Sequence, residues 1–398
     1  MPNEPVIRSL TVQNLLSFGE EPTTIELRQL NILIGANGSG KSNLIEVLGL
    51  LQNAPKELAT AIGNGGPIDE WLWKGVAKSR GKPPTALIEV CVGPSKGRKV
   101  VLRYRLAFTK AGYRFEITDE RLENERRQPN SPRPYFYYDL GNGRPTLNYK
   151  GVKRGLRQEE INPQLSILAQ RKDPEHYPEI THVGDVFTKF RLYRDWEFGT
   201  VANVREPCDA SLPNEYLEED FSNLGVVLNR LLSVPPIKSQ ILDSLATFYG
   251  DTKDLRTSIE GGKVQTRLEE KHLNATIPLI RMSDGTLRWL TLLSILLNPD
   301  PPSLVCIEEP ELGLHPDMIH ELAKLLVDAS TRMQLIITTH SDRLVDELTD
   351  APEAVIVCEK EKGASKFSRL DQHQLSSWLK DYSLGQLWTK GQLGGTRW

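Results

Sequence analysis

The stretch GANGSGKSN, residues 35–43, constrains the fold of this chain more than any other feature. It matches G-x-x-x-x-G-K-[ST] and follows a compact apolar run from Leu30 to Ile34. It precedes KSNLIEVLGLL, whose apolar residues recur at helical spacing. The pattern predicts a buried strand, a glycine-rich turn and a helix, an arrangement that points backbone N–H groups at the phosphates of a nucleoside triphosphate.

The residues of this turn have separate predicted roles. Lys41 is expected to pair with the phosphates, and the Ser42 hydroxyl is expected to be a ligand of Mg²⁺. The other positions expected to surround the nucleotide are Gly35, Ala36, Asn37, Gly38, Ser39, Gly40 and Asn43. An ordinary glycine turn is the alternative, but the full pattern between a strand and a helix favours nucleotide binding.

Two glutamates follow a second apolar strand in LVCIEEPELGLHPD, residues 304–317. Such a strand delivers Glu308 and Glu309 to the carboxyl edge of the sheet, where open α/β sheets bind ligands. We expect Glu308 to hold Mg²⁺ and Glu309 to orient and deprotonate an attacking water. The alternative is that one of them caps a helix or pairs with a lysine.

A further strand, LIITTHS, ends in His340. A histidine is more often a packed or surface residue than a catalytic one. Its place at the end of a strand that follows the acidic strand favours a contact with the γ-phosphate. Glu309, His340 and Lys41 are therefore the candidate catalytic residues.

The rest of the chain alternates between strand and helix patterns. Residues 85–125 alternate apolar and polar positions and predict an antiparallel meander. The Pro- and Gly-rich stretch 127–152 predicts a junction or a mobile surface excursion. Residues 160–250 are mainly helical in pattern, and the late strands are each followed by an amphipathic segment, as in strand–helix α/β units.

Composition excludes several classes of protein. The chain has 398 residues, 39% hydrophobic and 25% charged, which is typical of a globular protein. We find no apolar run near the roughly 18 residues that a membrane span requires, and no secretory leader. The four cysteines form no C-x-x-C pair, which argues against a zinc ribbon or a disulfide framework. We expect a cytoplasmic protein without membrane contact.

Charge is unevenly distributed along the chain. Residues 74–157 contain 20 Lys or Arg against 7 Asp or Glu, although the whole chain has a net charge of −3. A basic face attracts phosphate backbones, so this region is a candidate contact for nucleic acid. No aromatic stacking pattern accompanies the charge along the sequence, and a solvated β-rich surface is the alternative.

The motifs GANGSGKS, MSDGT, IEEPE, GLHPD and TTHS, in this order, resemble the ABC-type ATPase head, in particular the RecF-like and OLD-like ATPases of the AAA_21 or AAA15 families. The resemblance implies an α/β fold: a RecA-like P-loop sheet plus an antiparallel β subdomain, with an inserted mainly helical lobe. Lobe I is expected at residues 1–155 and 291–398, and lobe II at residues 156–290. ATP and Mg²⁺ are the expected cofactors.

In that family, the segment corresponding to Ser283, Asp284, Gly285 and Thr286 is the signature motif, which contacts ATP held by another subunit. A serine hydroxyl, a glycine N–H and a helix N-terminus bind anions without supplying a reactive group. The alternative is a helix N-cap at Ser283 or Asp284, and both interpretations can hold together.

The chain departs from the family pattern at one motif and leaves two assignments open. Glu308 stands where the metal-binding residue is usually Asp, although OLD-like groups often have Glu there. The glutamine that joins the lobes and reaches the metal is not fixed by the sequence, and Gln170 is the candidate. Phe18 is a candidate for stacking on adenine or, equally, for the core.

The resemblance implies an ATPase that pairs head to head on ATP, as a homodimer or higher homo-oligomer, and acts as a switch. Similar ATPases work with a separate effector, including Toprim-like nucleases, in phage defence. Only 58 residues follow His340, with no D-x-D after Glu359, so we expect no intrinsic nuclease. The alternatives are an ATP-dependent scaffold with little hydrolysis and a DNA-binding repair ATPase. The apolar tail residues Leu384, Leu387, Trp388 and Leu393 are expected to dock on the body or on a partner.

Overall fold

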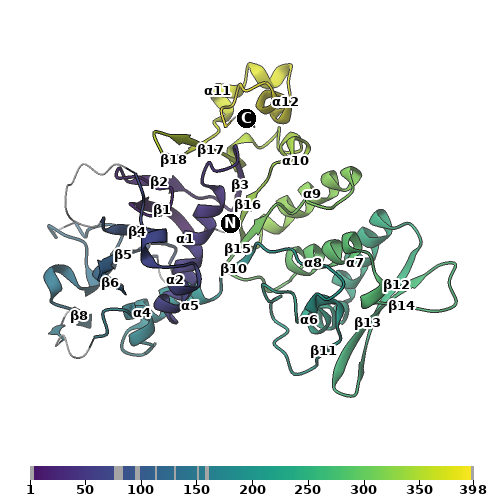
Figure 1. The fold of residues 1–398 in the computed structure, drawn as a ribbon, viewed down its shortest axis with the longest axis horizontal. Coiled ribbons are helices and arrows are strands. Elements are labelled where there is room, and N and C mark those ends of the chain that lie inside the picture. The colour runs from purple at the N-terminus through teal and green to yellow at the C-terminus, as the bar shows by residue number, and fades with distance from the viewer. Residues whose placement is uncertain are drawn as a thin grey trace. The chain divides into compact units, whose positions relative to one another are not determined.

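The computed structural model describes residues 4–75, 84–94, 99–112, 114–129, 131–149, 152–156 and 161–395. Its chain forms two compact units (Figure 1). The first contains Met1–Phe190, Ala351–Tyr382 and Gln386–Trp398, and the second contains Arg191–Asp350 and Ser383–Gly385. The lobes expected from the sequence have other bounds, 1–155 with 291–398 and 156–290, because they were drawn from the order of the motifs. That division stays a prediction.

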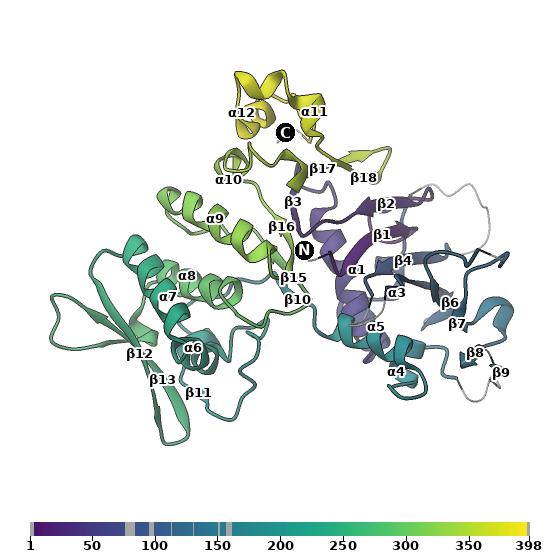
Figure 2. The ribbon, with the colours of Figure 1, turned by 180° about the vertical axis from the view of Figure 1, so that it is seen from behind.

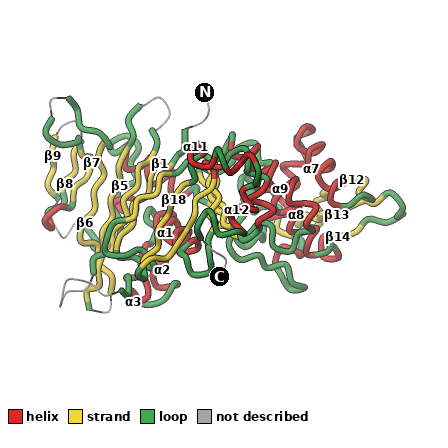
Figure 3. Tube along the Cα trace, turned by 90° about the horizontal axis from the view of Figure 1, so that it is seen from above, coloured by secondary structure: helices red, strands yellow, loops and turns green. Residues whose placement is uncertain are grey.

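A large antiparallel sheet makes up much of the first unit, and Figure 3 shows its strands side by side. Its strands, in spatial order, are β2 (Thr23–Glu26), β1 (Ile7–Gln13), β4 (Ala86–Val92), β5 (Leu102–Ala111), β6 (Arg114–Asn124), β7 (Phe136–Asp139), β8 (Thr146–Tyr149) and β9 (Val152–Gly155).

The predicted meander is confirmed in the centre of this sheet. Val90 of β4 lies opposite Tyr104 of β5, which lies opposite Leu122 of β6, and all three side chains are buried. Alternation with period two places such residues on one face. The Pro- and Gly-rich stretch differs from the expectation, because its described part extends the sheet as β7, β8 and β9.

A second set of strands in the first unit carries the glycine turn. β3 (Leu30–Ile34) is fully buried and pairs in parallel with β17 (Val355–Glu361), which pairs antiparallel with β18 (Ala364–Arg369). Helix α1 (Lys41–Asn53) follows the turn and buries its leucines, as its spacing predicts. The other helices of this unit are α2 (Leu58–Asn64), α3 (Ile68–Trp71), α4 (Ile167–Gln170), α5 (Pro178–Thr188) and α11 (Gln372–Leu375). Helix α12 (Leu384–Thr389) lies in the C-terminal tail.

The second unit contains three parallel strands in the order β10 (Arg191–Tyr193), β15 (Leu304–Glu308) and β16 (Gln334–Thr338). As predicted, helices α9 (Ile319–Ser330) and α10 (Asp342–Asp346) follow the last two. Strand β15 is preceded by the long buried helix α8 (Asp284–Leu296).

The second unit also contains a small antiparallel sheet that the sequence analysis did not predict. Strand β13 (Lys263–Glu270) pairs with β12 (Thr252–Glu260), β11 (Cys208–Asp209) and β14 (Ile277–Pro278). Its long hairpin extends beyond helices α6 (Leu224–Leu232) and α7 (Pro235–Phe248) in both Figure 1 and Figure 2. Single 3₁₀ turns lie at Gly141–Gly143, Asn203–Arg205, Leu279–Arg281, Pro316–Met318, Pro352–Ala354 and Trp378–Lys380.

Candidate functional site

The glycines of the turn between β3 and α1 are required by geometry. Gly35, Gly38 and Gly40 have φ angles of 150°, 76° and 107°. A Cβ atom on Gly35 would lie 2.2 Å from the carbonyl oxygen of Cys358, and one on Gly40 would lie 2.1 Å from Ser365 Oγ. Only glycine fits these two positions, so the turn is a phosphate-loop (P-loop) conformation held by its surroundings.

Lys41 is folded back onto the same turn. Its Nζ donates hydrogen bonds to the carbonyl oxygens of Gly35 at 2.7 Å and Ala36 at 3.1 Å, and the residue is 6% exposed. Asn37, Gly38 and Ser42 are exposed and Asn43 is half-buried. The predicted phosphate-binding residues are therefore together, with the lysine ammonium inside the turn and the Ser42 hydroxyl at its surface.

Two serines that the sequence analysis missed, Ser17 and Ser365, form hydrogen bonds that hold the turn in place. Ser365 Oγ of β18 lies 2.7 Å from both the carbonyl oxygen of Ser39 and the hydroxyl of Ser17. The backbone N–H of Ser365 donates to the Ser17 carbonyl oxygen at 2.8 Å. No local motif marks either serine, because they come from opposite ends of the chain.

The C-terminal tail contacts the P-loop from another side. Trp388 is buried, and its Nε1 donates to the Gly395 carbonyl oxygen at 3.0 Å. The Gly395 N–H donates to Glu359 Oε1 at 2.8 Å. A Cβ on Gly395 would lie 3.2 Å from the Cα of Gly35. Leu384 and Leu387 are also buried, so docking on the body is confirmed for these tail residues.

In the second unit, the acidic pair lies at the carboxyl end of β15, as predicted. Glu308 Oε2 is 3.5 Å from Arg194 Nε, and Glu308 Oε1 is buried without a hydrogen-bond partner among the described residues. Glu309 has a φ of 46°, a strained value for a residue with a Cβ. Its N–H donates to the Thr338 carbonyl oxygen of β16 at 3.0 Å.

His340 and Glu309 are brought together. His340 Nε2 lies 3.9 Å from Glu309 Oε1, and their side chains are 33% and 41% exposed. Both groups are thus open to a ligand, in contrast to the buried strands that carry them. Their assigned catalytic roles stay predictions.

Glu311 is a third carboxylate that the sequence analysis missed. It accepts hydrogen bonds from Thr339 Oγ1 at 2.5 Å and from the His340 N–H at 3.1 Å. Burial raises the pKa of its carboxyl group. The side chain therefore ties the loop after β15 to the loop after β16 and positions the backbone of His340. The third glutamate of EEPE was its signal in the sequence.

The predicted signature segment begins helix α8. Ser283 is the N-cap: its Oγ accepts from the Thr286 N–H at 3.1 Å and lies 2.8 Å from Thr286 Oγ1. Ser283 and Asp284 are exposed, whereas Gly285 is half-buried. The N-cap alternative is confirmed for Ser283, and it leaves the exposed end of the helix available to an anion.

Two buried arginines support this helix end. Arg205 pairs with Asp284 and donates to the Met282 carbonyl oxygen at 2.8 Å. Arg288 lies over the Trp196 ring, 4.7 Å from its centroid. The Arg288 side chain lines a cavity of about 480 Å³ that Gly285, Asp284 and Gly313 also line. Arg288 Nη1 is buried without a hydrogen-bond partner among the described residues.

Two further sequence assignments have a local explanation. The Gln170 amide accepts from the Asn162 N–H at 2.9 Å and donates to the Leu165 carbonyl oxygen at 2.6 Å, so it closes its own loop. Its assignment as the lobe-joining or metal-binding glutamine stays a prediction. Phe18 is fully buried and stacks on Phe367 at 5.6 Å, which confirms the core alternative for this residue.

Each unit has a predicted oxygen donor for Mg²⁺, Ser42 in the first unit and Glu308 in the second. The Oε1 atom of Glu308 is buried and has no hydrogen-bond partner among the described residues. Within the described part of the chain, no group of three or more His, Cys, Asp or Glu is arranged as a metal site.

These features define a P-loop ATPase head of the ABC type. Residues 30–346 match the AAA_21 family, described as "AAA domain, putative AbiEii toxin, Type IV TA system". The chain belongs to this family, so the family expected from the sequence is confirmed.

Solved structures with this fold include SMC head domains. The chain is similar to an SMC head bound to the C-winged helix domain of ScpA, with a TM-score of 0.59 and 17% identity over 94% of this chain and 100% of that one. An SMC head derived from Pyrococcus furiosus gives a TM-score of 0.55 and 15% identity over 95% and 99%. These likenesses confirm the fold class. No curated protein sequence matches the chain. Among the described residues, no helix has the length and hydrophobicity needed to cross a membrane.

Proposed function

We propose that the chain binds and hydrolyses ATP with Mg²⁺, and that nucleotide binding drives pairing of two copies. The observation that carries the proposal is the P-loop itself, in which only glycine fits at residues 35 and 40 and the Lys41 ammonium is held inside the turn. An ordinary turn needs neither feature. The AAA_21 family and the ABC-type fold support the same activity.

The residues of the second unit would supply the hydrolytic step. Glu309 would accept a proton from the attacking water, because its carboxylate is exposed and carries no strong hydrogen bond in the described structure. His340, which lies beside Glu309, would contact the γ-phosphate, and this contact would be lost when the phosphate leaves. Glu308 and Ser42 would hold Mg²⁺, which supplies charge neutralisation for the phosphates when bound.

Pairing through the signature segment is supported by Gly285. This residue lies in the first turn of α8, and a Cβ there would have only ordinary contacts, at 3.5 Å from Phe248 and 3.6 Å from Gly313. Glycine in a helix costs roughly 0.5–1 kcal/mol relative to alanine, and the fold of the unit does not require it. A group outside the unit, such as a phosphate held by a second copy, could approach the backbone closely at this position, and this would explain why residue 285 is glycine.

The biological output is proposed from the family alone. An ATP-driven pair is a switch, since contacts with the γ-phosphate favour the closed state only until the phosphate leaves. We propose control of a separate effector protein, such as a Toprim-like nuclease, in defence against phage. The SMC heads of similar fold are bound to a partner, ScpA, in their own structures, which supports partner binding in general.

The test is phosphate release and native mass on the purified chain, with ATP, with ADP and without nucleotide. The wild type should release phosphate and form ATP-dependent pairs. Glu309→Gln should lose phosphate release and accumulate the pairs, whereas Glu321→Gln, on helix α9, should behave as the wild type. Pairing without any phosphate release in the wild type would favour a scaffold instead.

A further inference from the structure

A small aromatic pocket lies at the far end of the large sheet, separate from the P-loop residues. It has a volume of about 260 Å³ and is lined on the strand side by Tyr135, Tyr137, Asn148 and Tyr149 and on the helix side by His176 and Tyr177. Ligand pockets for drug-sized molecules measure about 300–1,000 Å³, so this one suits a single flat ring system.

The pocket walls are half-exposed or exposed rings from three parts of the chain. Tyr135 and Tyr137 lie at β7, with ring centroids 5.1 Å apart. Tyr149 of β8 lies 5.6 Å from His176 and 6.3 Å from Tyr177, just before α5. Such rings offer stacking surfaces, which are worth roughly 1–3 kcal/mol for each nucleobase. The sequence did not reveal this cluster, because its members are separated by up to about forty positions.

Asn148 provides an unsatisfied polar group in this apolar setting. The residue is 7% exposed, and its Oδ1 is buried without a hydrogen-bond partner among the described residues. An orphan acceptor of this kind is costly unless a ligand supplies a donor. Every nucleobase carries at least one N–H on its edge, and asparagine is a common partner for such edges.

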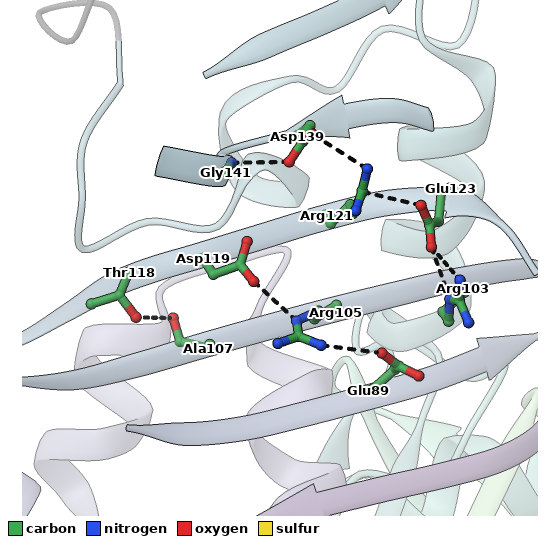
Figure 4. A network of polar contacts seen from close by, with 10 residues as sticks. All are labelled: Glu89, Arg103, Arg105, Ala107, Thr118, Asp119, Arg121, Glu123, Asp139 and Gly141. Atoms are coloured by element: carbon green, nitrogen blue, oxygen red, sulfur yellow. Dashed lines mark hydrogen bonds and ion pairs between the residues drawn. The ribbon is translucent and has the colours of Figure 1, made fainter. Parts of the chain in front are cut away.

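Exposed basic residues lie on and next to the strands that carry the pocket. In the middle of the sheet, Arg103, Arg105 and Arg121 pair with carboxylates of neighbouring strands (Figure 4). These pairs engage three of the basic residues in region 74–157. The basic residues on or next to β7, β8 and β9 are exposed and form no ion pair with a described carboxylate: Arg133, Arg144, Lys153 and Arg154.

We propose that this pocket binds one unpaired nucleobase of a single-stranded nucleic acid, with Asn148 accepting from the base edge. The phosphates would follow the strand side, where the basic residues lie, because Glu175 and Glu179 line the helix side. A quaternary ammonium group, the other common ligand of aromatic pockets, has no N–H to donate to Asn148. The inference does not depend on ATP hydrolysis.

Fluorescence anisotropy with two labelled probes separates base binding from phosphate binding. One probe is a mixed-sequence DNA strand of about twelve nucleotides, and the other is an abasic backbone of equal length. The full chain at low salt should bind the first at least roughly 10-fold more tightly. Asn148→Leu and Tyr149→Ala should reduce the affinity for the first probe by roughly 10-fold and leave the abasic probe unchanged.

Tyr149→Phe retains the ring and should bind like the wild type, which guards against a folding defect in Tyr149→Ala. Tyr249→Ala, in the second unit, serves as the matched control. Equal affinity for the two probes, or no binding of either at low salt, would overturn the proposal. So would tight binding of a trimethyllysine peptide that the DNA strand fails to displace.

Discussion

Lys41 Nζ lies 2.7 Å from the carbonyl oxygen of Gly35, so the P-loop lysine donates a hydrogen bond to the backbone of its own loop. A second hydrogen bond, to the Ala36 carbonyl oxygen, fixes the same ammonium group. In the proposed function, ATP binding would exchange these two hydrogen bonds for contacts with phosphate oxygens. The ammonium group is already held inside the turn, so this exchange would cost little side-chain entropy.

Lys41→Ala is expected to weaken ATP binding. Loss of charge-assisted hydrogen bonds worth roughly 1.5–3 kcal/mol each predicts a decrease in affinity of at least about 10-fold. Titration with a fluorescent ATP analogue measures it. Lys56→Ala removes an exposed lysine just beyond α1 and should bind ATP normally. Unchanged affinity in Lys41→Ala would contradict the assigned phosphate contact.

Gly285→Ala tests whether the signature glycine serves a contact outside its own unit. Because a Cβ fits there, the substitution should raise the free energy of unfolding by up to about 1 kcal/mol and still reduce ATP-driven pairing. Thermal unfolding and native mass measure the two effects. Gly184→Ala is the matched control, since this glycine of α5 also has room for a Cβ, with its nearest contact 3.6 Å away at Pro55. It should stabilise the chain without affecting pairing.

Gly395→Ala tests the contact between the C-terminal tail and the P-loop. Gly395 has a φ of 60°, and a Cβ there would lie 2.9 Å from Val357 Cγ1 and 3.2 Å from Gly35 Cα. The tail should be displaced and ATP affinity reduced several-fold. Gly261→Ala has the same backbone strain, with a φ of 56°, but nothing within 4 Å of the new Cβ. Both variants should lose roughly 1–2 kcal/mol of stability, and only the first should weaken ATP binding.

Glu120 makes the stability of the first unit depend on pH. This buried carboxyl accepts hydrogen bonds from Tyr104 Oη at 2.7 Å and from the Ile167 N–H at 2.9 Å, and burial raises its pKa from 4.5 to about 7. A folded-state pKa above the unfolded value means that the folded chain binds the proton more tightly. The contribution of this group to the free energy of unfolding is therefore greatest below about pH 4.5. It decreases as the pH rises toward 7.

The expected loss across that window is on the order of 3 kcal/mol, from the 1.36 kcal/mol per pKa unit. Urea unfolding at pH 5 and pH 8 measures it. Glu120→Gln should flatten this dependence, whereas Glu116→Gln, on the same strand but exposed, should preserve it. An unchanged pH dependence in Glu120→Gln would show that another group is responsible.

Local patterns predicted the elements that carry the motifs. The strand at Leu30–Ile34, the helix after it and the two parallel strands ending near Glu308 and His340 were all readable, because apolar runs and glycine turns act over a few residues. Glu311 had a visible signal, but its buried hydrogen bonds depend on the neighbouring strand.

Contacts between distant segments could not be predicted in this way. Ser17 and Ser365 meet behind the P-loop although 348 positions separate them, and nothing in either neighbourhood indicates it. Strands β12 and β13 contain few apolar residues, and the sequence analysis assigned no strand to them. The aromatic pocket likewise depends on strands β7 and β8 and the start of helix α5, which only the fold brings together.

The central claim is that the P-loop of one copy and the signature segment of another complete one ATPase site. The most direct test mixes two inactive variants, Lys41→Ala and Ser283→Arg, and measures phosphate release. A mixed pair contains one site with both parts intact, so the mixture should recover activity, up to about a quarter of the wild-type rate if pairs form at random. If native mass shows mixed pairs and the mixture stays as inactive as each variant alone, the account is wrong.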